Sequence, residues 1–306
     1  MTGHKRHKLI IDCDPGHDDA IALILAHSIA DVVGITTVSG NAPLLDVTAN
    51  ALAIVDLIGV ETPVHSGASR PLSGPARHAE RIHGATGLEG ARLEKPKRDP
   101  ASKGAVDYLL SASREHPDCW LVAIGPLTNV ALAIQADPAF AGRIAGISIM
   151  GGSTERGNVT PSAEFNIWAD PVAADMVFAS SARIKLCGLN LTRQLKTSDD
   201  LIAELRAVQT SCAEFAADLF EFLHGRMQEL IGERAASLHD PCAVLAVVAE
   251  DLFEFAEKNV SVDTSEGEER GKTRIETPVG SRAGSVRVAY RIDAAAAMEK
   301  VVSALA

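Results

Sequence analysis

Short apolar runs alternate along the chain with longer stretches whose apolar positions follow a helical period. Residues Lys8–Cys13 (KLIIDC) have the composition of a buried strand, and residues 18–26 begin a helix with two aspartates in its first turn. A second apolar run at residues 32–39 is followed by a helical stretch at residues 46–57. The first quarter of the chain therefore predicts two strand-helix units.

The same order recurs further along. Apolar runs stand at residues 120–125, 147–150 and 184–189, and helical patterns follow at residues 127–135, after Asp170 and beyond residue 189. This alternation predicts an α/β fold: an open, mainly parallel sheet flanked by helices, with a Rossmann-like core. In such sheets ligands bind at the carboxyl ends of the strands, so the active site is expected there.

Two stretches interrupt the alternation. Residues 70–102 are polar, rich in Pro, Gly and charge, and contain HGATGLEG; a loop of that length is usually functional or mobile. Residues 264–272 (TSEGEERGK) form a charged turn between two alternating segments and predict a β-hairpin, and residues 294–305 predict an amphipathic helix. Because there is no repeat and no clear linker, we expect a single domain over residues 1–306.

Composition narrows the function classes. The chain has 306 residues, 46% hydrophobic and 23% charged, as in soluble globular proteins. A formal net charge of −11 and only 4% aromatic residues argue against nucleic-acid binding. No apolar run approaches the length of about 18 residues that a membrane span needs, so no membrane partner is expected. The five cysteines are far apart without a CxxC pair, which favours a reduced, cytoplasmic location.

The strongest candidate for chemistry is IIDCDPGHDDA at residues 10–20. Four aspartates crowd the predicted end of the first strand, and they are Asp12, Asp14, Asp18 and Asp19. Four carboxylates so close repel one another unless a cation or a positive helix end compensates them, and hard oxygen ligands suit Ca²⁺ or Mg²⁺. The alternative is structural, with helix capping by the last two aspartates and hydrogen bonds in the turn for the others.

Other candidate groups stand at later strand ends. In LHDP (residues 238–241), His239 could act as an acid and Asp240 as a metal ligand, although this pair also suits a simple helix start. In MGGSTERGNVTPSAEFNIWADP (residues 150–171), polar groups suited to binding hydroxyls follow an apolar strand; they are Asn158, Glu164 and Asn166. The turns VSGN (residues 38–41) and GPLTN (residues 125–129) are weaker signals, because turns favour Gly, Asn and Pro in any case.

A phosphatase remains an alternative from these residues. The first motif partly resembles the DxDx(T/V) loop of haloacid-dehalogenase-type phosphohydrolases, which use Mg²⁺ and a nucleophilic aspartate. Asp12 would be that nucleophile, but Gly16 stands where the loop requires Thr or Val. Neither a dinucleotide fingerprint nor a P-loop sequence is present.

Taken together, five sites stand in the order seen in the inosine-uridine-preferring nucleoside hydrolase family, which the chain resembles over about residues 8–250. They are DCDPGHDDA, VSGN, GPLTNVALA, the MGG…AEFNIWADP segment and HDP. The resemblance implies hydrolysis of the N-glycosidic bond of ribonucleosides, purine or pyrimidine, to ribose and free base. It also implies one Ca²⁺, held by Asp14, Asp19, the backbone carbonyl of Thr128, and Asp240.

The resemblance further implies a role for each site residue. Asp14 would be the general base that activates a water molecule on the metal, and His239 would assist the leaving base. The implied substrate-binding residues are Asp18 and Asn41 at the 2′-hydroxyl, Asn158 and Glu164 at the 5′-hydroxyl, Asn166 at the 3′-hydroxyl, Met150, and His83 near the base.

One departure concerns the base. Some family members carry a tyrosine before HDP, whereas residues 223–238 contain none and only Tyr108 and Tyr290 occur in the chain. The base preference therefore stays open. The resemblance implies a homodimer or homotetramer, and a non-catalytic nucleoside- or ribose-binding protein remains a further alternative.

Overall fold

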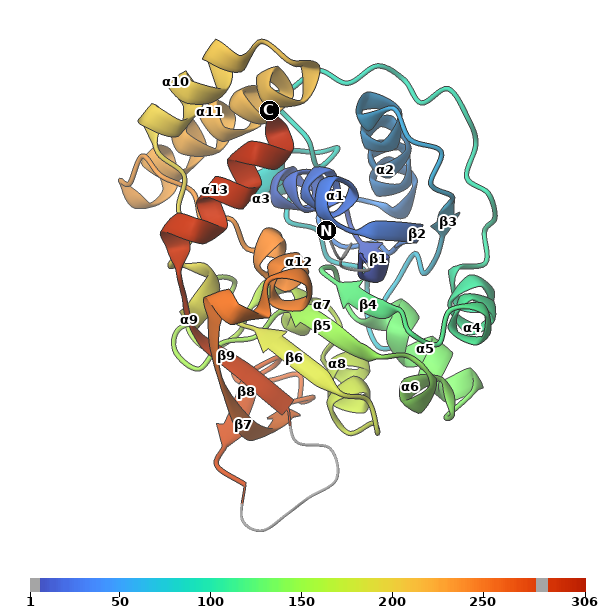
Figure 1. Ribbon diagram of the computed structural model, residues 1–306. Helices are drawn as coiled ribbons and strands as arrows, with labels where there is room; N and C mark the ends of the chain where they lie inside the picture. Colours follow the sequence, from blue (N-terminus) through green and yellow to red (C-terminus); the bar gives the residue numbers. More distant parts are fainter. Residues whose placement is uncertain (1–5, 279–285) are drawn as a thin grey trace.

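The computed structural model describes residues 6–278 and 286–306, and its strands join in one sheet with the order β3-β2-β1-β4-β5-β6-β9-β7-β8 (Figure 1). The pairs from β3 through to β9 are parallel, whereas β7 runs antiparallel to both β9 and β8. The strands are β1 (Lys8–Cys13), β2 (Asp31–Thr37), β3 (Val64–Ser66), β4 (Trp120–Ala123), β5 (Gly146–Met150), β6 (Ile184–Cys187), β7 (Phe253–Val262), β8 (Thr273–Glu276) and β9 (Val286–Ile292).

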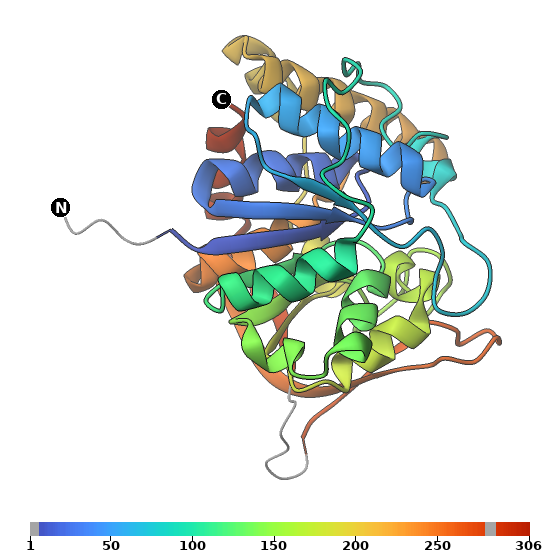
Figure 2. The ribbon, with the colours of Figure 1, turned by 90° about the vertical axis from the view of Figure 1, so that its right-hand side faces the viewer.

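Helices cover both faces of this sheet (Figure 2). One layer holds α1, α2 and α10–α13, and the other holds α4, α5, α6 and α8. The helices are α1 (His17–Ile29), α2 (Leu44–Ile58), α3 (Glu80–His83), α4 (Ala105–Glu115), α5 (Thr128–Ala136), α6 (Phe140–Arg143), α7 (Phe165–Ala169), α8 (Pro171–Phe178), α9 (Leu189–Thr192), α10 (Asp199–Val208), α11 (Ser211–Ile231), α12 (Asp240–Val248), the 3₁₀ turn η1 (Glu250–Leu252) and α13 (Ala294–Leu305). The predicted α/β class and mainly parallel sheet are confirmed.

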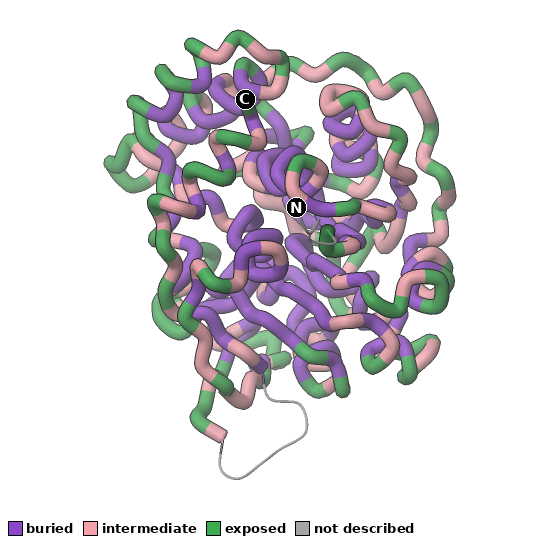
Figure 3. The backbone as a smooth tube through the Cα atoms, viewed as in Figure 1, coloured by how far each residue is buried: buried purple, intermediate pink, exposed green. Residues whose placement is uncertain are grey.

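The central strands are apolar at successive positions because both of their faces are buried. In β1, Leu9 and Ile11 pack toward α1 and α12, while Ile10 packs into the second core under α4 and α5. Figure 3 shows this continuous buried centre, with exposed residues confined mostly to the outer helices and loops. The two hydrophobic cores, one on each face of the sheet, hold the strand ends in place. A site built on those ends requires such support.

The strand order reverses between β1 and β4. From β1 the chain moves outward through β2 and β3, then returns to start β4 on the other side of β1. Connections that leave two neighbouring strands in opposite directions open a crevice at their carboxyl ends, where α/β proteins bind ligands. The turns after β1, β2 and β4 meet at this point, and they carry the first motif, VSGN and GPLTN.

Most of the remaining predictions hold, with some additions. The predicted hairpin corresponds to β7 and β8, and the predicted final helix to α13. The long loop at residues 70–102 contains one helical turn, α3. Strands β3 and β9 and helix α4 were not predicted. The single domain over residues 1–306 stays a prediction, and residues 1–5 and 279–285 within it lie outside the described residues.

Within the described chain, every helix is too short or too polar to cross a membrane.

Candidate active site

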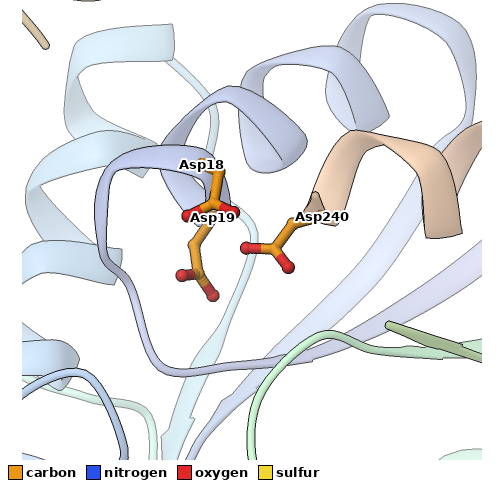
Figure 4. A group of neighbouring side chains, drawn as sticks. All are labelled: Asp18, Asp19 and Asp240. Carbon is orange, nitrogen blue, oxygen red and sulfur yellow. The ribbon is translucent and has the colours of Figure 1, made fainter. Parts of the chain in front are cut away.

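Three carboxylates converge where the first turns of α1 and α12 meet. Oxygens of Asp18, Asp19 and Asp240 lie within 4.8 Å of one another. Figure 4 shows Asp18 and Asp19 projecting from the start of α1 toward Asp240 at the start of α12. Backbone N–H groups at a helix N-terminus carry partial positive charge, so each helix favours the carboxylates on its own first turn.

Asp14 lies beside this group and is fixed tightly. Its Oδ2 accepts the backbone N–H of Asn41 at 2.6 Å, and a methyl group on Gly40 or Gly125 would lie within 2.6 Å of its carboxylate. Glycines after β2 and β4 therefore make room for the side chain that follows β1. The other oxygen, Oδ1, is buried and has no hydrogen-bond partner among the described residues.

Asp19 organises the turn that carries these aspartates. Its two oxygens accept the backbone N–H groups of Asp14 at 3.2 Å and Gly16 at 3.0 Å, and the Asn41 side chain also donates to it at 3.0 Å. Asn41 in turn donates to the backbone oxygen of Asp14. One amide side chain from the end of β2 thus joins two aspartates of the first motif.

Burial without a countercharge raises the pKa values of Asp14, Asp19 and Asp240. For Asp14 the main cause is burial, followed by the charge of Asp19. Burial, followed by the charge of Asp18, raises the pKa of Asp19 to about 7 and that of Asp240 well above its usual range. These are the residues that the sequence proposed as metal ligands.

A hard divalent cation fits this donor set. Several carboxylates face one another, and one buried oxygen of Asp14 lacks a hydrogen-bond donor, as expected of atoms that bind a metal. Thr128, the fourth proposed ligand, is buried at the start of α5, three residues after Gly125, and its hydroxyl donates to Asp170 at 2.7 Å. Its backbone carbonyl remains a proposed ligand.

Asp12 is not placed to attack a phosphate. The carboxylate is fully buried, and one oxygen accepts hydrogen bonds from Thr36 and from Asn129. Burial raises the pKa of Asp12 to about 6. A buried, hydrogen-bonded carboxylate inside the sheet joins β1, β2 and α5 but cannot reach an outside substrate, which removes the main support for the phosphatase alternative.

A second polar group forms at the end of β5. Glu164 caps α7 by accepting the N–H groups of Asn166, Gly152 and Ile167 at 2.9–3.1 Å. The Asn166 side chain donates to backbone oxygens at the ends of β4 and β5, including that of Met150 at 3.2 Å. Burial, and to a smaller extent the charge of Asp18, raises the pKa of Glu164 to about 7.

Asn158 differs from Glu164 and Asn166 because it is exposed, whereas they are buried. Its Oδ1 accepts the backbone N–H of Phe165 at 3.0 Å. Arg193, after α9, donates to the backbone oxygens of Arg156 and Gly157 and so holds the turn that carries Asn158. Asn158 is therefore tied to the start of α7 rather than to the acidic group.

Two half-exposed histidines border the acidic group. The His83 ring lies over Gly16, where an added methyl group would be 2.7 Å from both His83 Nδ1 and the Asn41 amide. His239 immediately precedes Asp240, and its Nδ1 lies 2.7 Å from the Thr192 hydroxyl. Burial lowers the pKa of both rings, and the charge of Asp18 opposes this in each.

The structure thus gathers most of the proposed residues at the carboxyl ends of the central strands and adds residues that sequence reasoning missed. Asn129 donates to Asp12, and Asp170 accepts the hydroxyl of Thr128. Both residues stand in motifs already singled out, GPLTN and WADP. His17 is fully buried against His83 and stands inside the first motif. Its place within DCDPGHDDA was the available signal.

The family described as inosine-uridine preferring nucleoside hydrolase matches residues 9–299 of the chain. Uridine nucleosidase 1 of Arabidopsis thaliana is 41% identical over 266 residues, which span 85% of this chain and 79% of the relative. The pyrimidine-specific ribonucleoside hydrolase RihA of Shewanella woodyi is 40% identical over 275 residues, 88% of each chain. Both similarities therefore extend over more than four fifths of this chain.

A solved structure shares the fold closely. The purine-preferring ribonucleoside hydrolase from Gardnerella vaginalis superposes with a TM-score of 0.92 and 30% sequence identity, covering 97% of this chain and 98% of that one. The similar proteins therefore include one described by a purine and others described by pyrimidines.

Glu164 allows a test of the buried polar group through the pH dependence of stability. Because its pKa is raised from 4.5 to about 7, the folded state binds this proton more tightly than the unfolded state does. Its stabilising contribution is complete below about pH 4.5 and is lost as the pH rises through about 7. In chelator, wild-type stability relative to Glu164→Gln should therefore fall by about 3 kcal/mol between pH 4.5 and 8.

Urea denaturation at several pH values measures this difference. Glu94→Gln changes an exposed glutamate and serves as the matched control, with a curve parallel to that of the wild type. Parallel curves for Glu164→Gln as well would show that Glu164 does not hold a raised pKa.

Proposed function

Because the chain belongs to the inosine-uridine preferring nucleoside hydrolase family, we propose that it hydrolyses pyrimidine ribonucleosides, uridine first, with Ca²⁺ bound by its aspartates. Membership in this family establishes the reaction class, hydrolysis of the N-glycosidic bond of a ribonucleoside. The base preference, the cation and the roles of single residues are the proposal.

The observation that carries the proposal is the group of buried carboxylates at the switch point of the sheet. Asp14 follows β1, Asp19 stands in the first turn of α1, and Asp240 stands in the first turn of α12. Burial and mutual repulsion raise the pKa values of all three. The fold maintains this unfavourable arrangement at the place where α/β sheets bind ligands. Such an arrangement is typical of a cation site that also favours positive charge on a bound sugar.

The reaction is a substitution at C1′ of the ribose. The oxygen of a water molecule bonds to C1′, the C1′–N bond breaks, and its electron pair leaves with the base, through a transition state in which the ribose resembles an oxocarbenium ion. Asp14 would take the proton from the attacking water as general base. Its Oδ2, held by the Asn41 backbone N–H, and its unpaired Oδ1 suit that role, because one oxygen fixes the carboxylate while the other stays available for a proton.

The other residues divide between the two ends of the substrate. Asp18 is half-exposed and would accept a hydrogen bond from the 2′-hydroxyl of the ribose, together with Asn41. Glu164, Asn166 and Asn158 would bind the 3′- and 5′-hydroxyls beyond β5. His83 and His239 stand on the other side, where they would face the base.

A Ca²⁺ ion would be held by Asp14, Asp19, Asp240 and the Thr128 carbonyl, and when bound it supplies the positive charge that orients and acidifies the attacking water. The ion also relieves the repulsion among the three carboxylates. This follows from their oxygen chemistry and burial, which suit a hard cation.

The preference for pyrimidines is supported from two sides. The two relatives at 40–41% identity are described as acting on uridine or pyrimidine ribonucleosides. Residues 223–238 also lack a tyrosine, and Tyr108 is occupied elsewhere, under His65 and bonded to the Val33 carbonyl. A base side without that aromatic ring loses more stacking with a two-ring purine than with a single-ring pyrimidine.

The base preference can be measured directly. With saturating Ca²⁺, kcat/KM for uridine should exceed kcat/KM for inosine by about tenfold or more, a difference of about 1.4 kcal/mol in transition-state stabilisation. Release of reducing sugar from each nucleoside gives both constants. Equal values, or a larger value for inosine, would contradict the pyrimidine assignment while leaving the reaction class intact.

The role of Asp14 predicts a large loss in Asp14→Asn. The amide keeps the shape of the side chain but cannot take a proton, so kcat for uridine should fall by about 10²–10⁴-fold with the ion saturating. Asp31→Asn is the control, because Asp31 is an exposed aspartate at the start of β2, on the amino side of the sheet. Circular dichroism shows whether both variants fold. Full activity in a folded Asp14→Asn variant would remove Asp14 from the mechanism.

The cation can be tested without turnover. After treatment with chelator, addition of Ca²⁺ should raise the melting temperature, with about 2.7 kcal/mol of stabilisation at a concentration 100 times Kd. Asp19→Asn and Asp240→Asn should lose most of this increase, whereas Asp31→Asn should keep it. Titration calorimetry should give one ion per chain. A melting temperature that no divalent cation changes would exclude the proposed site.

A further inference from the structure

His17 is a buried histidine in the middle of the most acidic segment of the chain. It is the first residue of α1, between Gly16 and Asp18, and its side chain is fully buried. A buried histidine among aspartates would ordinarily bond a carboxylate or a metal. Its ring instead contacts His83, the Glu89 carbonyl and Phe222, and burial, followed by the charge of His83, lowers the pKa of His17 to about 3.

Both ring nitrogens of His17 contact the long loop. Nε2 donates to the backbone carbonyl of Glu89 at 2.9 Å, and Nδ1 lies 2.9 Å from Nδ1 of His83. The ring stacks on Phe222 of α11, with centroids 5.2 Å apart and planes inclined by 4°. Three elements therefore fix the orientation of the His17 ring: α1, the loop and α11.

His83 is the only polar side chain that His17 contacts among the described residues, and it borders the crevice. Its ring lies over Gly16 beside the Asn41 amide, and the charges of Asp18 and His239 both affect its pKa. The ring is half-exposed, so a substrate can reach it. Because the neutral His17 ring donates through Nε2, its Nδ1 accepts and the His83 Nδ1–H is the donor of the contact between the two rings. Among the described residues, the other group near the His83 ring nitrogens is the backbone N–H of His17 itself, 3.3 Å from the same Nδ1.

We propose that His17 is a positioning residue for His83, which it holds against the base side of the crevice so that His83 can assist departure of the base. The inference rests on the proposed function. The C1′–N bond breaks with its electron pair on the base, which then needs a proton or a hydrogen bond, and a group that supplies either must be held at the correct point. His17 itself does not touch the substrate.

The competing explanation is that His17 merely anchors the loop. A second anchor exists for comparison. The Asn50 side chain donates to the backbone oxygens of Pro15 at 3.0 Å and Thr86 at 2.7 Å, and so ties the same loop to the same turn without contacting His83. If loop anchoring were the only role, loss of Asn50 and loss of His17 would have similar consequences.

Two substitutions separate the contacts of His17. His17→Asn places an amide near the position of Nδ1 and keeps a polar partner for His83. His17→Gln places its amide near Nε2, so it keeps the bond to the Glu89 carbonyl and loses the partner of His83. The two variants differ by one methylene group, so effects on folding that arise from lost polarity apply to both.

Two substrates separate the steps. Uridine requires help for its departing base, whereas 4-nitrophenyl β-D-ribofuranoside releases nitrophenolate, a stable anion that needs no proton. We expect His17→Gln to lower kcat for uridine by about 10–100-fold and to lower turnover of the nitrophenyl riboside by less than about threefold. His17→Asn should restore most of the uridine activity. KM for both substrates should change little, because the ribose contacts remain.

A double variant and the Asn50 control complete the test. His83→Phe should show the same selective loss, and adding His17→Gln to it should cause no further loss. Asn50→Ala should leave the ratio of the two activities at the wild-type value. Equal losses for both substrates, equal effects of the Gln and Asn variants, additive losses in the double variant, or a changed ratio in Asn50→Ala would each overturn the positioning role. A wild-type protein that hydrolyses neither substrate would instead overturn the proposed function.

Discussion

Repulsion among buried carboxylates is the constraint on which the site depends. Asp14, Asp19 and Asp240 lie in a part of the protein that excludes water, where unpaired negative charges are costly. The fold compensates them only in part, with the N-termini of α1 and α12 and with donors such as the Asn41 backbone and side chain. In the proposed mechanism, the remaining charge would favour a bound cation and a sugar that becomes positive during reaction.

The sheet makes this arrangement possible because its turns meet at one point. Asp14 follows β1, and the glycines that border it follow β2 and β4. A side chain at Gly40 would lie 2.0 Å from Asp14, and one at Gly125 would lie 2.6 Å from it, so each strand end leaves space for its neighbour. Glu164 and Asn166 extend the same edge to β5. The residues proposed to bind the ribose therefore stand mostly at strand ends that are held by the two hydrophobic cores.

Much of this could be predicted from the sequence, and the limits are physical. The central strands could be predicted because burial on both faces leaves continuous apolar runs. The ends of the first two strands then predict the positions of Asp14 and Asn41 at the carboxyl edge of the sheet. Strand β3 has three residues and β9 pairs with partners distant in sequence, so no local pattern marked them. Asp12 and Asp14 looked equivalent along the chain, yet one points between the strands toward Asn129 and the other into the crevice. In a regular strand, side chains two residues apart point to the same face, so the difference arises because β1 ends at Cys13 and Asp14 already lies in the turn that follows.

The contacts of His17 could not be predicted from the sequence, because its partners are 66 and 72 residues away along the chain. The two sides of the proposed site also differ in whether their residues stand at strand ends or come from segments distant in the sequence. In the proposed function, the ribose side would be fixed by the sheet, whereas the base side would be formed by His83 from the long loop and by His239 before α12; the side chain of His17 contacts His83, and that of Thr192 contacts His239. Similar proteins that share the fold are described by uridine in one case and purine in another. Under the proposed function, a ribose side fixed by strand ends and a base side built partly from a loop would allow the base preference to change while the acidic group stays in place.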